Sequence, residues 1–79
     1  MRFLYTVTKG ASDPTGASLP LHMAVNGSLE VGHDVTVLFA GDGSEVLLGD
    51  NPQTMQGLGL PPMKELLAGL KDKRATVFV

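Results

Sequence analysis

Charged and hydroxyl side chains in the first half of the chain could together bind a small anion. Lys9 offers a cation, and Asp13 and Asp42 offer carboxylates. Thr15 and Ser18 add hydroxyls close to the backbone N–H groups that begin a predicted helix. Such N–H groups attract anions, because the helix dipole places partial positive charge there. The residue types therefore predict that these side chains could hold a small anion.

Three of these residues also have structural explanations, which stay open at this point. Asp13 precedes Pro14, a pair typical of turns, and Asp42 lies between two glycines. Lys9 follows an apolar run and could be an ordinary solvated residue at the end of a strand. A turn or a solvated strand end explains each residue without any ligand.

The residue types predict neither a catalytic set nor a metal site. His22 and His33 are eleven residues apart, without acidic or thiol partners at the spacing of metal ligands. No combination of nucleophile, base and orienting group is visible. The chain has no cysteine, which excludes disulfides and any thiol chemistry within its 79 residues.

No nucleotide motif is complete, so we predict no bound cofactor. Gly10 and Gly16 lack both the Gly-x-Gly-x-x-Gly spacing and the Gly-Lys-Ser/Thr ending of phosphate-binding loops. The segment from Thr15 to Ser18 is closer to a flavodoxin-type phosphate loop, but Asp13 stands where a hydroxyl residue is wanted. A flavodoxin-like cofactor binder stays an alternative.

The composition is that of one folded domain over residues 1–79, with 43% apolar and 18% charged residues. Six basic and eight acidic residues give a net charge of −2 without a basic cluster, so nucleic acid is not an expected partner. The chain has no run of about 18 apolar residues and no signal-peptide pattern. We therefore expect a cytoplasmic protein without a membrane partner.

Three apolar, β-branched runs predict strands at residues 2–8, 34–40 and 75–79. Their near-continuous apolar character is typical of strands in a parallel sheet that is covered on both faces. About 25 and 34 residues separate the runs, which is too long for hairpins and fits crossover helices. The sequence therefore predicts an α/β fold of βαβαβ order around a parallel sheet.

In the first crossover, residues 10–32, the sequence predicts a helix over residues 17–31. Ser18 is its expected N-cap, Pro20 lies in its first turn and Gly32 is its C-terminal cap. One face of this helix is apolar and small enough to lie on the sheet: Ala17, Leu21, Ala24, Val25, Ser28 and Val31. Leu19 and Met23 lie one turn apart on the opposite face. We expect them to form an oligomer interface, although scattered surface apolar residues are the simpler explanation.

The second crossover predicts a helix that opens at Pro61 and Pro62. Its apolar stripe consists of Met63, Leu66, Leu67 and Leu70. A short helical turn over residues 44–48 and a loop over residues 49–59 precede it.

Six segments, taken in order, resemble the N-terminal two thirds of proteins of the DsrE/DsrF-like family. They are Val7-Thr8-Lys9-Gly10, Asp13-Pro14-Thr15, Ala17-Ser18-Leu19-Pro20, Gly32-His33-Asp34-Val35, Ala40-Gly41-Asp42 and Gln56-Gly57-Leu58-Gly59-Leu60-Pro61-Pro62. The resemblance implies a three-layer α/β/α domain of the YchN-like fold that assembles into trimers or hexamers. It also implies sulfur relay, and some relatives carry the label "predicted peroxiredoxin".

In such relatives a cysteine-bearing loop follows the strand that matches residues 75–79, and its thiol passes sulfur as a persulfide. We therefore expect a single domain that lacks its C-terminal part and acts in intracellular sulfur transfer with a sulfur-carrier protein as partner. It would be sulfurtransferase-like when complete and inactive as these 79 residues. The resemblance also implies a pocket wall formed by Lys9, Gly10, Asp13, Ser18, Gly41 and Asp42. Lys9 and the Ser18 end of the first helix are the candidates for lowering the pKa of that thiol. A non-catalytic oligomeric binding or assembly module is the other alternative.

Overall fold

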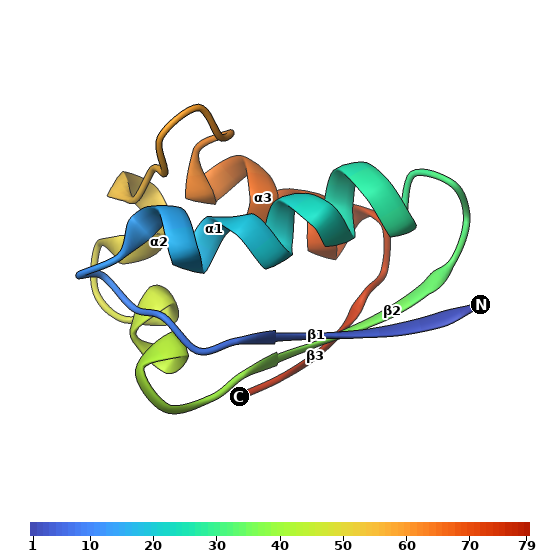
Figure 1. Cartoon of the computed structure of the whole chain (residues 1–79), viewed down its shortest axis with the longest axis horizontal. Coiled ribbons are helices and arrows are strands. Elements are labelled where there is room, and N and C mark those ends of the chain that lie inside the picture. Colours follow the sequence, from blue (N-terminus) through green and yellow to red (C-terminus); the bar gives the residue numbers. More distant parts are fainter.

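A computed structural model describes all 79 residues and contains a three-stranded parallel sheet. The strands are β1 (Arg2–Val7), β2 (Asp34–Phe39) and β3 (Thr76–Phe78), in the order β1-β2-β3 (Figure 1). Each strand lies within the run that predicted it. The α/β class, the parallel sheet and the βαβαβ order are therefore confirmed.

The first crossover begins with α1 (Pro14–Met23), three residues earlier than predicted. The N-cap is Asp13, whose Oδ1 accepts a hydrogen bond from the Gly16 N–H at 3.0 Å. Pro14 takes the first helical position, where a missing N–H breaks no hydrogen bond. The prediction of Ser18 as N-cap was wrong, because the Asp13-Pro14 pair already starts the helix.

The helix continues into η1 (Ala24–Ser28), a turn of π-helix in which the Leu29 N–H donates to the Ala24 carbonyl at 2.9 Å. It ends before Val31, which was predicted on the buried face and is 70% exposed in the turn that follows. The predicted helix was therefore too long at this end. Gly32 has a φ of +88°, so the left-handed turn expected there is present.

The second crossover contains the 3₁₀ helix η2 (Gly41–Leu47), the short helix α2 (Asn51–Thr54) and α3 (Met63–Asp72). α3 confirms the prediction, with its N-cap at Pro62 and its apolar stripe facing the core. α2 was not predicted, because the Asn-Pro and Gly-x-Gly signals of residues 49–59 indicate a loop. Its Pro52 lies in the first turn, where helices accept proline.

A single core lies between the sheet and the helices. It consists of Val7, Ala17, Leu21, Ala24, Val25, Val35, Val37, Phe39, Val46, Met55, Met63, Leu66 and Leu70. The helices lie together on one side of the sheet (Figure 1). Consecutive crossovers of the same hand that step across a sheet in the same direction place their helices on one face. The second helical layer that the resemblance implies is not formed by these residues.

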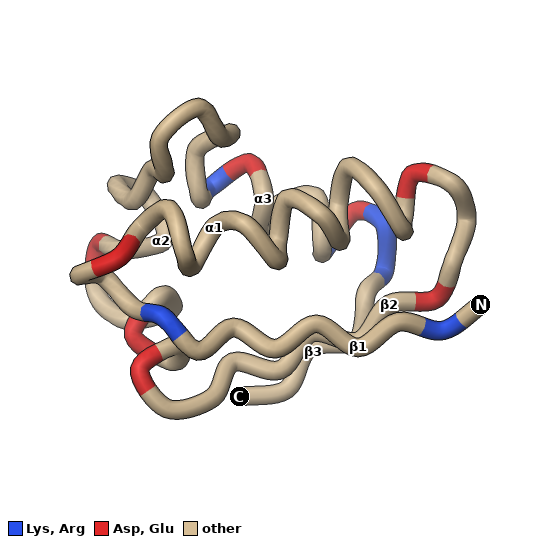
Figure 2. Tube along the Cα trace, viewed as in Figure 1, with Lys and Arg blue, Asp and Glu red and all other residues tan.

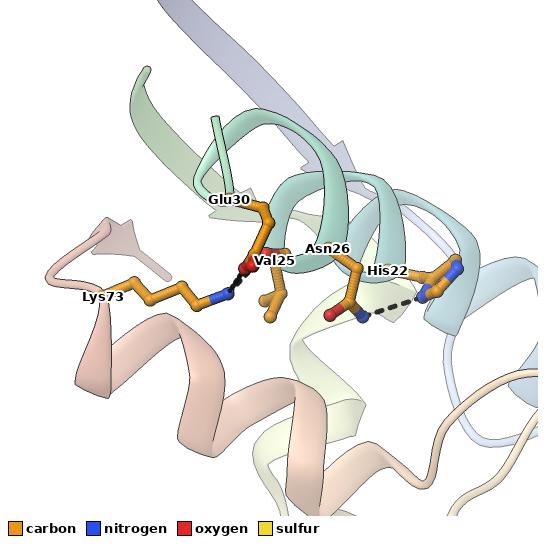
Figure 3. Close-up of polar contacts among 5 residues, drawn as sticks. All are labelled: His22, Val25, Asn26, Glu30 and Lys73. Carbon is orange, nitrogen blue, oxygen red and sulfur yellow. Dashed lines mark hydrogen bonds and ion pairs between the residues drawn. The ribbon is translucent and has the colours of Figure 1, made fainter. Parts of the chain in front are cut away.

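A polar junction ties the end of α3 to η1 (Figure 3). The Lys73 Nζ donates to the Val25 carbonyl at 3.0 Å and forms an ion pair with Glu30. The hydrogen bond from Lys73, and then its charge, hold the pKa of the Glu30 carboxyl below its ordinary value. One turn away, the Asn26 amide donates to the His22 Nδ1 at 3.0 Å.

Candidate functional site

The loops that follow β1 and β2 meet at the carboxyl edge of the sheet, as expected for parallel strands. The loop after β1 turns through a hydrogen bond from the Asp13 N–H to the Gly10 carbonyl at 3.0 Å. The loop after β2 crosses close beneath it, because Gly43 packs directly on the Val7 carbonyl. A Cβ on Gly10 would lie only 2.5 Å from the Asp42 carbonyl oxygen. Both loops therefore form one surface.

Lys9 and Asp13 lie side by side on this surface. A Cβ added to Gly16 would lie 2.5 Å from the Asp13 Oδ2 and 3.1 Å from the Lys9 Cγ. The two side chains therefore flank Gly16 at the start of α1. The Asp13 carboxylate already accepts the Gly16 N–H, so this carboxylate occupies the position where the helix would attract an anion.

Glu45 belongs to the same surface, although the sequence did not single it out. Its Oε1 accepts a hydrogen bond from the Ala11 N–H at 3.3 Å, across 34 residues of chain. Glu45 lies in η2, which brings it under the loop after β1. No local motif marks this position, because the contact depends on how the two loops cross.

Ser18 does not contribute to this surface. It is fully buried within α1, and its Oγ has no hydrogen-bond partner. The structure thus brings together five of the six residues predicted for the pocket wall and places the sixth in the helix–sheet interface. Gly41, with a φ of +56°, and Asp42 are exposed at the start of η2.

The charge at this edge is mainly negative (Figure 2). Lys9 lies beside Asp13, and the loop that crosses beneath them carries Asp42 and Glu45. An excess of negative charge repels an anionic ligand and raises the pKa of a nearby thiol. The edge can accept hydrogen bonds and attract cationic groups more readily than it can hold an anion.

The two cavities of the structure lie elsewhere. One, of about 280 Å³, is at the amino ends of the strands and is lined by Arg2, Asp34, Val35, Thr36, Arg74 and Thr76. The other is an open apolar groove of about 450 Å³, lined by Tyr5, Met23, Gly27, Ser28, Val31 and His33. Met23, predicted at an oligomer interface, therefore lines a groove. Leu19 and Met23 are both about half exposed, as expected for the outer face of α1.

The face of the sheet away from the helices is open, and the strand register arranges its side chains in rows. Leu4 is level with Thr36, which in turn is level with Thr76. The next row consists of Thr6, Leu38 and Phe78. Leu4 is 66% exposed and Phe78 is 57% exposed. Leu38 and Phe78 therefore lie side by side, and Leu4 lies one row closer to the amino ends of the strands.

The structure contains no group of three or more His, Asp or Glu side chains placed to hold a metal ion. None of its helices has the length and apolar character needed to cross a membrane. Compared with protein-family models, curated proteins and solved structures, the chain gives no match.

Proposed function

We propose that this chain is a non-catalytic assembly module whose open sheet face packs against a second copy of the chain. The observation that carries the proposal is a parallel sheet covered on one face only. Parallel sheets are found almost entirely with both faces covered. Here the open face presents Leu4, Leu38 and Phe78 in adjacent rows, which a facing sheet would bury.

The exposed apolar residues do not result from loose packing. The accessible surface is 4725 Å², close to the roughly 4,600 Å² typical of a folded protein of this mass. The chain is compact, and some of its exposed apolar side chains are gathered on one face. A small core also leaves a chain of this length little stability of its own, so burial against a partner would stabilise it.

Sedimentation velocity over a range of concentrations tests this proposal. We expect the chain to associate, and Phe78→Gln to shift the equilibrium to monomers while circular dichroism shows the fold intact. Leu58→Gln is the matched control, because Leu58 is 88% exposed on a loop away from the sheet. A monomer at all concentrations would refute the proposal. If Met23→Gln disrupts the assembly and Phe78→Gln does not, the outer face of α1 is the interface instead.

A second candidate is the sulfur relay that the DsrE-like resemblance implies. In it, the chain acts in the cytoplasm within a trimer or hexamer and forms a wall beside a persulfide carried on a cysteine outside these 79 residues. It is favoured by the convergence of two resembling segments, those containing Lys9 and Asp42, on one edge. The negative charge of that edge opposes it, which is why it stands second.

Nuclear magnetic resonance separates the two candidates. Glutathione persulfide should shift the amide signals of Ala11 and Gly16 more than reduced glutathione does, and Lys9→Gln should remove the difference. Equal shifts with both compounds would exclude a sulfur-specific site. We do not propose flavin binding, because the Asp13 carboxylate already caps α1 where a flavin phosphate would be needed.

A further inference from the structure

The cavity at the amino ends of the strands contains two arginines and little to neutralise them. Arg2 leads β1 and is level with Asp34 at the start of β2. Arg74 precedes β3, so that the two guanidinium groups approach the cavity from opposite edges of the sheet. Five of the six residues that line the cavity are charged or carry a hydroxyl.

Neither guanidinium has a partner within the chain. The only ion pair of the structure joins Lys73 to Glu30, and no hydrogen bond involves the side chain of Arg2 or Arg74. Asp34 is the one carboxylate of the cavity, so the lining carries a net positive charge. The hydroxyls of Thr36 and Thr76 lie level with each other and can donate hydrogen bonds to the same ligand.

The backbone of Arg74 indicates that this side chain has a role beyond stability. Its φ of +61° makes it the only non-glycine residue with a positive φ. It follows α3 in a Schellman motif, where its N–H donates to the Lys71 carbonyl and the Ala75 N–H donates to the Leu70 carbonyl. Glycine is the residue that best fits this position, because any Cβ is strained there. Strained residues are found preferentially at binding and catalytic sites.

We propose that this cavity binds a small anion through its carboxylate or phosphate oxygens, held between Arg2 and Arg74. Guanidinium groups match such oxygens with paired hydrogen bonds. The two threonine hydroxyls complete the contacts, and Asp34 accepts a hydrogen bond from a hydroxyl of the ligand. The volume, about 280 Å³, limits the ligand to a phosphate or a short carboxylic acid.

Titrations with inorganic phosphate and with malate, followed by nuclear magnetic resonance at constant ionic strength, test the proposal and distinguish the two oxygen sources. We expect saturable shifts of the arginine Nε–H signals and of the Thr36 and Thr76 amides with at least one probe. Arg74→Gly should weaken binding at least tenfold while its melting temperature stays equal or rises. Loss of binding without loss of stability would identify a ligand-binding role.

Lys64→Gln is the matched control, because it removes one positive charge at the start of α3, the end of the helix far from Arg74. It should leave affinity unchanged. Arg2→Gln, at an exposed position of β1, gives a second test should Arg74→Gly fail to fold. Shifts that do not saturate, equal affinity in Arg74→Gly, or equal losses in the control and the cavity variants would each overturn the proposal.

The cavity lies on the same open face as the assembly surface proposed above, because Thr36 and Thr76 are in one row with Leu4. Anion binding is therefore tested on the monomer as well. The titrations are repeated in the Phe78→Gln background, which is expected to be monomeric. Unchanged anion binding there keeps the two proposals separate. Absence of binding in both backgrounds refutes the anion site alone.

Discussion

Gly43→Ala is expected to be among the most damaging single substitutions in this protein, although it adds only one methyl group. Gly43 is the third residue of η2 and packs on the end of β1. A Cβ at this position would lie 2.5 Å from the Val7 carbonyl carbon and 3.2 Å from the Thr8 nitrogen, and closer still to the Val7 carbonyl oxygen. These neighbours are backbone atoms, which cannot rotate away as a side chain would.

The cost follows from the contacts that must separate. The Val7 carbonyl accepts the Ala40 N–H at 3.0 Å, and the Gly43 N–H donates to the Ala40 carbonyl at 2.9 Å. Each hydrogen bond contributes about 1 kcal/mol to stability, and overpacking adds about 1–3 kcal/mol. We therefore expect a loss of about 3–5 kcal/mol in the free energy of unfolding, a large share of the roughly 4–12 kcal/mol typical of a chain this long.

Urea denaturation followed by circular dichroism measures this loss. Gly27→Ala is the control, because a Cβ there meets no atom within 4 Å, and it should be neutral or stabilising by up to about 1 kcal/mol. A Gly43→Ala protein that loses less than about 1 kcal/mol would show that the two loops do not approach as described. The two loops would then not form the single surface at the carboxyl edge of the sheet.

Three further predictions concern the core and the junction between α3 and η1. Ser18→Ala should leave the free energy of unfolding unchanged or raise it by about 1 kcal/mol, since it removes a buried hydroxyl without a partner; a clear loss in thermal denaturation would mean that the hydroxyl is hydrogen-bonded. Leu66→Ala should cost about 2–5 kcal/mol, because this side chain is almost fully buried, and a loss below 1 kcal/mol in urea would contradict its place in the core. The Glu30 carboxyl has a lowered pKa, so its pairing with Lys73 stabilises the fold fully at pH values above 4.5, the ordinary pKa of this carboxyl. This stabilisation is lost as the pH falls through the lowered pKa. Melting temperatures from pH 7 to pH 3 should therefore fall less in Glu30→Gln than in the unmodified chain, and parallel curves would speak against the ion pair.

Much of the carboxyl edge could be predicted from sequence, because residues that follow parallel strands must come to the same edge. The structure brings Lys9, Asp13 and Asp42 to this edge, and their role in a binding site stays a prediction. The same reasoning failed for Ser18, since a hydroxyl near a helix start can equally lie inside the first turns when an earlier residue caps the helix. It could not find Glu45, whose contact with the Ala11 N–H spans 34 residues.

The amino acid sequence by itself determined the three strands, which are apolar and β-branched runs, and the parallel sheet, because the runs are too far apart for hairpins. α3 was determined as well, because its apolar residues recur at helical spacing. It also determined the left-handed turn at Gly32, since glycine is the residue that readily adopts a positive φ. The sequence did not determine which face of the sheet the helices cover. That depends on the direction in which successive crossovers step, which is a property of the whole chain.

Gly43 and Arg74 are turn residues whose environment only the tertiary structure reveals. In the sequence, Gly43 belongs to an ordinary glycine-rich turn, and only the folded chain shows a carbonyl against its Cα. Arg74 looks like one of several basic residues at the end of a helix, and only the folded backbone shows a strained φ beside a cavity. Local patterns predict the elements, whereas close approaches between distant segments arise only when those elements pack.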